Sequence, residues 1–252
     1  MTRRILASAA LLLMLAALYP VYAKAPAELF GPAKVEILAA EVEAQSAKLG
    51  ELLATKEGYE ALQADGMKAR LVPQAGGIIS IVAQTIAEHP EKEKTKINAT
   101  ALRDAGLAVQ QAKSYEEAHA AHAQVKAALA GTGEAGAVEH DWTKLSDMYN
   151  MMEEVNARSA LLGRAVRRPR DVDEAVRDAT TLAVLAAVIE IDTHPVTDPA
   201  KVPQWKKYAT TYRESMSKVA EALRTNDPAA ARTAYAAGIR ACDFCHEDFR
   251  AK

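Results

Sequence analysis

Cysteine and aromatic residues are scarce in this sequence, and neither sign of charge is in excess. Aromatic residues make up only 5% of the 252 residues, and this scarcity together with abundant alanine favours helices over sheets. A formal net charge of −2 provides no basic footprint, so we expect no nucleic-acid partner. Half of the residues are hydrophobic, which is enough to bury a sizeable core in one large or two small domains.

Long apolar runs are also scarce, and the one that occurs is near the start of the chain. Two arginines precede the apolar run Ile5–Leu18, which is short for a membrane span. Val21 and Ala23 then provide the small residues of a cleavage site. We therefore expect residues 1–23 to be a signal peptide, with an uncleaved anchor as the alternative. The protein is expected to be periplasmic or otherwise exported, with no stable membrane span after cleavage.

The only two cysteines lie in the sequence CDFCH at residues 242–246. Exported cysteines usually form disulfides, but a bond between residues three apart closes a loop too small to constrain much of the unfolded chain. A structural zinc site needs four ligands, and only three candidates occur here. A thioredoxin-like pair lies near a βαβ pattern, and none surrounds this one. The remaining interpretation is C-x-x-C-H, the attachment motif of c-type haem.

The chemistry of haem attachment explains this spacing. Residues three apart lie on one face of a helix, so Cys242 and Cys245 can each form a thioether with one haem vinyl group. His246 follows directly and can serve as the proximal ligand of the iron. The sequence therefore predicts one covalently bound haem c.

Helix start signals and helical periodicity occur along most of the remaining chain. Apolar residues recur at helical spacing from Val35 to Ala54. Three later segments begin with N-cap signals: Ser114 with Glu117, Asp171 with Glu174, and Asp227 before Pro228. Glycine or proline predicts breaks at Gly76-Gly77, 131–137 and 196–203, and the middle one is expected to link two domains.

The two halves of the chain resemble each other. Residues 81–90 match 186–195, both ending in His-Pro, and residues 114–129 match 227–242. The offset grows from 105 to 113 residues, which predicts about eight extra residues between the second and third helices of the second half.

This repeat predicts an all-α fold of two tandem, antiparallel four-helix bundles. We expect a haemless four-helix repeat over residues 24–132 and a haem-binding bundle over residues 140–252, because only the second half contains C-x-x-C-H. The two bundles are expected to pack against each other and to hide the apolar faces of both.

The second half resembles cytochrome c prime and its low-spin relative cytochrome c-556, four-helix bundles whose last helix ends in this motif. The matching residues are Cys242, Cys245, His246, Phe249 and Arg250. Ordinary small cytochromes c carry the motif near the N-terminus, so its C-terminal position is discriminating. The resemblance covers residues 141–252, is weaker over the first half, and implies that Phe249 and Arg250 belong to the haem surroundings.

The resemblance further implies a haem whose far face lies against the first helix of the bundle, here Asp141–Arg164. In cytochrome c-556 types a methionine of that helix ligates the iron. In cytochrome c prime types an apolar residue covers an open, five-coordinate iron that binds nitric oxide or carbon monoxide. Met152 or Met148 is the possible sixth ligand, since residues four apart share a face; a methionine stripe also commonly fills a core.

The sequence thus predicts an exported monohaem cytochrome that transfers single electrons to a redox partner of unknown identity. The alternative is a five-coordinate protein that binds nitric oxide or carbon monoxide. We predict no enzymatic activity, because no set of nucleophile, base and orienting group and no paired carboxylates stand out. His119 and His122 are too few ligands for a metal site and are expected to be solvated.

Overall fold

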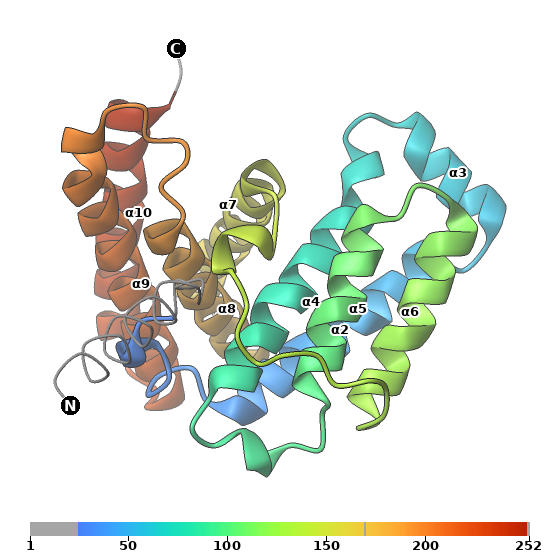
Figure 1. The fold of residues 1–252 in the computed structure, drawn as a ribbon. Coiled ribbons are helices and arrows are strands. Elements are labelled where there is room, and N and C mark those ends of the chain that lie inside the picture. Colours follow the sequence, from blue (N-terminus) through green and yellow to red (C-terminus); the bar gives the residue numbers. More distant parts are fainter. Residues whose placement is uncertain (1–24, 169, 251–252) are drawn as a thin grey trace, which may run out of the picture.

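A computed structural model describes residues 25–168 and 170–250, and every regular element in them is a helix (Figure 1). The prediction of an all-α fold is confirmed. The predicted signal peptide, residues 1–23, lies outside the described residues. Within the described part of the chain, none of the helices combines the length and apolar character that a bilayer span requires.

Five α-helices form the first half of the molecule, one more than the repeat predicts. They are α2 (Val35–Leu52), α3 (Lys56–Ala64), α4 (Leu71–Glu88), α5 (Ala99–Gln111) and α6 (Tyr115–Leu129). α4 packs on α2 and α5, and α6 packs on α5 and α2. The additional short helix α3 begins where the Thr55 side chain accepts a hydrogen bond from the Gly58 N–H, and it lies at one end of this group (Figure 1).

Four α-helices form the second half. They are α7 (Met148–Ala165), α8 (Val172–Ile191), α9 (Val202–Arg224) and α10 (Pro228–Phe249). The predicted N-caps at Ser114, Asp171 and Asp227 are confirmed, because each side chain accepts a hydrogen bond from a backbone N–H of the first helical turn. α9 packs closely against both α8 and α10, whereas α7 packs on α8 and on α4 of the other half.

The predicted break at Gly76-Gly77 is wrong, since both glycines are buried inside α4. Gly76 lets α5 approach. A Cβ atom on Gly76 would lie 2.7 Å from the Gly106 carbonyl oxygen, and one on Gly106 would lie 2.8 Å from the Gly76 carbonyl oxygen. Two backbones therefore cross in direct contact where the sequence pattern suggested a turn.

The predicted position of the extra residues in the second half is also wrong. The linker between α4 and α5, residues 89–98, has the same length as the linker between α8 and α9, residues 192–201. The additional residues lie inside α9, which has 23 residues where its counterpart α5 has 13. α10 is likewise longer than its counterpart α6, with 22 residues instead of 15. Apart from lacking a counterpart of α3, the second half therefore differs from the first mainly by its longer helices α9 and α10.

The two halves pack against each other along α2, α4, α7 and α8, and one apolar core continues through both. At one end of this contact the buried indole of Trp142 donates a hydrogen bond from Nε1 to Glu88 Oε1 at 2.9 Å. α7 lies centrally in Figure 1, between α10 and α4, and it packs on α8 and α4.

Candidate functional site

The two cysteines lie on the last turns of α10 as free, half-buried thiols. Burial raises the pKa of Cys242 to about 12 and that of Cys245 to about 11, so both are protonated at neutral pH. Both side chains pack against the apolar core, while His246 is exposed. The motif therefore presents two neutral thiols to the interior of the second half.

These thiols line a cavity of about 230 Å³ between α7 and α10, here called the α7–α10 cavity. Most of its wall is apolar. The lining residues are Met152, Val155, Asn156 and Ser159 of α7, Ile189 of α8, Tyr208, Ala209 and Tyr212 of α9, and Ile239, Ala241, Cys242, Asp243, Cys245 and His246 of α10. The structure thus brings Met152 to the same cavity as the three motif residues.

Two tyrosines hold one end of the α7–α10 cavity in place. Tyr235 of α10 donates its hydroxyl to the Ser159 carbonyl of α7 at 2.8 Å. The same ring occupies the space over Gly163, where a Cβ atom would lie 2.5 Å from the tyrosine hydroxyl oxygen. The hydroxyls of Ser159 and the buried Tyr212 are hydrogen-bonded at 2.8 Å. These contacts tie α7 to α9 and α10 through side chains while their backbones stay apart.

The other residues predicted for the site lie at its margin. Met148 is half-buried and is outside the cavity lining, and Met151 is fully buried in the core. Phe249 packs edge-to-face on Trp205, with ring centroids 5.2 Å apart. Arg250 follows the end of α10 as an exposed residue and does not line the cavity. Among the two methionine candidates, the geometry favours Met152.

The extended turns of α9 and α10 support each other around the motif. Besides the Trp205–Phe249 contact, the Tyr208 hydroxyl donates to Asp248 Oδ2 at 2.9 Å. The Tyr208 ring also lies 6.5 Å from that of Phe244. The extra residues of α9 therefore hold the last turns of α10, which carry Cys245 and His246. The repeat pattern in the sequence indicates the extra length but not the contacts that the added residues make with α10.

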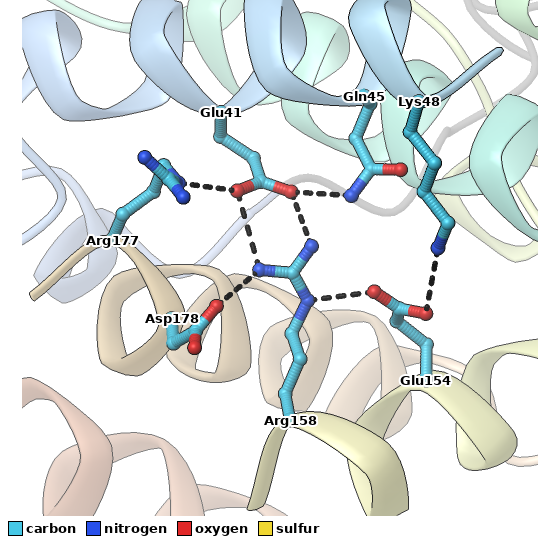
Figure 2. A network of polar contacts seen from close by, with 7 residues as sticks. All are labelled: Glu41, Gln45, Lys48, Glu154, Arg158, Arg177 and Asp178. Atoms are coloured by element: carbon cyan, nitrogen blue, oxygen red, sulfur yellow. Dashed lines mark hydrogen bonds and ion pairs between the residues drawn. The ribbon is translucent and has the colours of Figure 1, made fainter. Parts of the chain in front are cut away.

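A buried group of charged side chains, missed by the sequence analysis, connects the two halves (Figure 2). We call it the interface ion cluster; it comprises Glu41 of α2, Glu154 and Arg158 of α7, and Asp178 of α8, all at least 90% buried. Arg158 binds Glu41 through both terminal nitrogens, at 2.5 and 3.2 Å. It also donates to Glu154 and Asp178, at 2.7 Å each.

Further groups at the edge of the interface ion cluster complete it. Arg177 lies 3.4 Å from Glu41, and Lys48 lies 4.0 Å from Glu154 (Figure 2). Gln45 donates to Glu41 at 2.9 Å. Three carboxylates are thereby matched by three cations, as buried charges require.

Asp178 gives the interface ion cluster a pH dependence. Burial raises the pKa of this carboxyl from 3.8 to about 6 and outweighs the attraction of Arg158. The folded protein therefore holds this proton more tightly than the unfolded chain, and the resulting stabilisation is present below pH 3.8 and lost as the pH rises through 6. For this group, raising the pH from about 5 to about 7 should lower the free energy of unfolding by roughly 1 kcal/mol. Urea titrations at both pH values check this; Asp178→Asn should lack that difference, and an equal difference in the variant would contradict the assignment.

The expectation of a solvated His122 is wrong. This side chain is 5% exposed, and its Nε2 lies 2.9 Å from the Ser46 carbonyl oxygen of α2. Burial lowers the pKa of His122. It is a core histidine that joins α6 to α2. Among the described residues, no group of three or more His, Cys, Asp or Glu side chains is arranged to hold a metal ion.

Known proteins provide no direct guide to this site. Comparisons with family models, curated proteins and solved structures found no match to the chain. The resemblance to cytochrome c prime and cytochrome c-556 therefore stays a prediction. The features of the chain that point to a function are the CDFCH motif and the residues that line the α7–α10 cavity.

Proposed function

We propose that this chain is an exported monohaem c-type cytochrome that transfers one electron at a time. The observation that carries the proposal is the α7–α10 cavity, in which Cys242, Cys245 and His246 face the same space as Met152 from another helix. A chance occurrence of the motif on a helix surface would not be expected to come with a largely apolar cavity and a thioether on its opposite side.

The residues present fit a covalently attached haem. Both thiols are half-buried on one side of α10 and open to the α7–α10 cavity. Each S–H would add across a vinyl double bond, with sulfur bonding to one carbon and hydrogen to the other, so that the attachment needs no oxidant. His246 would bind the iron on the α10 side and the Met152 sulfur on the α7 side. Bound haem would supply iron that cycles between its ferric and ferrous states.

The lining of α7 favours electron transfer over catalysis. Next to Met152 along the cavity, α7 contributes Val155, Asn156 and Ser159, none of which is an acid or base at ordinary pH. The Ser159 hydroxyl is hydrogen-bonded to the hydroxyl of Tyr212, which also lines the cavity. A methionine ligand would raise the reduction potential and keep the iron low-spin.

The optical spectrum of the purified protein, made in a host that attaches haem, tests this proposal. Reduced with dithionite, it should show a sharp low-spin spectrum that carbon monoxide leaves unchanged, because Met152 occupies the sixth position. A broad high-spin spectrum that changes with carbon monoxide would show an open iron and support the gas-binding alternative. A protein without haem absorption would overturn both.

A further inference from the structure

We propose that the haemless first half positions Met152 by fixing α7, the helix that carries it. Glu41 and Arg158 are the positioning residues, because they join α7 to α2 of the first half. This inference rests on the proposed function, since it concerns the sixth ligand of the iron. It assigns a role to the half of the chain that lacks the motif. α7 is the helix through which the first half could act on Met152, because it packs on both halves.

α7 carries two stripes of functional residues side by side. Met152, Val155 and Ser159 line the α7–α10 cavity. The residues that immediately precede them, Met151, Glu154 and Arg158, are buried and form a second stripe rotated by about 100°. Of this second stripe, Glu154 and Arg158 belong to the interface ion cluster. Any rotation of α7 therefore moves the cavity stripe and the cluster stripe together.

Within the second half, α8 is the one helix on which the backbone of α7 packs closely, as far as the described residues show. α9 packs closely on both α8 and α10. In the described residues, the backbone of α7 packs closely only on α8 and on α4 of the first half. The α7–α10 cavity separates α7 from α10, and the Tyr235 hydroxyl of α10 reaches across to the Ser159 carbonyl of α7. A helix bordering a cavity needs a second anchor to keep a fixed rotation and height.

The Arg158–Glu41 pair is suited to be that anchor. Its two nearly parallel hydrogen bonds join a planar guanidinium to a carboxylate of α2, which fixes direction as well as distance. Arg158 lies six residues after Met152, about 9 Å further along the helix axis. Because Arg158 also binds Glu154 and Asp178, it joins α2, α7 and α8 at one point. The pair is close enough to Met152 to set its height, yet does not line the cavity.

Glu41→Gln in the loaded protein tests this inference, since it keeps the side-chain shape and removes the charge that Arg158 grips. We expect a larger high-spin fraction. The apparent affinity of the ferrous form for carbon monoxide should rise by about tenfold or more, as for a typical coupling between sites. Haem attachment and helix content should stay unchanged. The matched control is Glu116→Gln, which breaks the exposed 2.7 Å ion pair with Lys56 in the same half and should leave the spectrum unaltered.

An unchanged spectrum and an unchanged carbon monoxide affinity in Glu41→Gln, with only a lower melting temperature, would overturn the inference and leave the proposed function intact. Failure of the proposed function is seen separately, in the spectrum of the unmodified protein; an open iron there would overturn both. If Glu41→Gln does not fold, Arg158→Lys serves instead, because it keeps the positive charge but cannot form the two paired hydrogen bonds of the guanidinium. The same spectral shift is then expected, and its absence contradicts the inference.

Discussion

Replacing Met152 by alanine should turn the iron of the loaded protein from low-spin to high-spin and open it to carbon monoxide. Met152 is the methionine of α7 that lines the α7–α10 cavity with Cys242, Cys245 and His246. Alanine removes the thioether and leaves space on the α7 side. If methionine occupies the iron 99% of the time, its loss should raise the apparent affinity for carbon monoxide about 100-fold.

Met148→Ala is the matched control for that prediction. Met148 lies on the same helix, is also half-buried, and is outside the cavity lining. The same deletion there should leave the spectrum and carbon monoxide binding as they are in the unmodified protein. A high-spin spectrum from Met148→Ala, or an unchanged low-spin spectrum from Met152→Ala, would show that the ligand is misassigned.

Replacing Arg158 by methionine should cost about 3–5 kcal/mol of unfolding free energy, the usual loss when one partner of a buried ion pair is removed. The substitution leaves Glu41, Glu154 and Asp178 buried without the guanidinium that binds all three. Such carboxylates must take up protons or draw in water, and either response weakens the contact between the two halves. Urea unfolding of the loaded protein measures the loss.

Arg224→Met provides the comparison for the stability prediction. Arg224 forms an ion pair with Glu221 within α9, and that partner is exposed. Its replacement should therefore cost only about 0–1 kcal/mol. A loss of similar size for Arg158→Met would mean that the interface ion cluster does not hold the two halves together, whatever its geometry.

Features with local causes were predictable from the sequence, and those with distant causes were not. The caps at Ser114, Asp171 and Asp227 depend on residues within one turn, and they were predicted correctly. Gly76 was mistaken for a break because its partner, Gly106, is 30 residues away and only the folded protein shows their contact. The repeat offset revealed extra residues but contained no information on which element they lengthen.

The same distinction applies to the candidate site. The motif residues Cys242, Cys245 and His246 lie within five consecutive positions, so the sequence shows them directly. Met148 and Met152 were equivalent in sequence because they share a helix face, and only the position of α10 separates them. Arg158 gave no signal at all, since its partner Glu41 is 117 residues away in the other half. A buried charge cluster between repeats can therefore be recognised only in the tertiary structure.

The most direct test of the central claim is the mass of one peptide. Cleavage after Arg240 and Arg250 releases ACDFCHEDFR, which contains both cysteines. From protein made in a host that attaches haem, denatured and treated with a thiol-alkylating reagent, the account predicts this peptide plus one haem, with neither sulfur alkylated. A peptide with two alkylated thiols, or one two hydrogens lighter and free of haem, would contradict it.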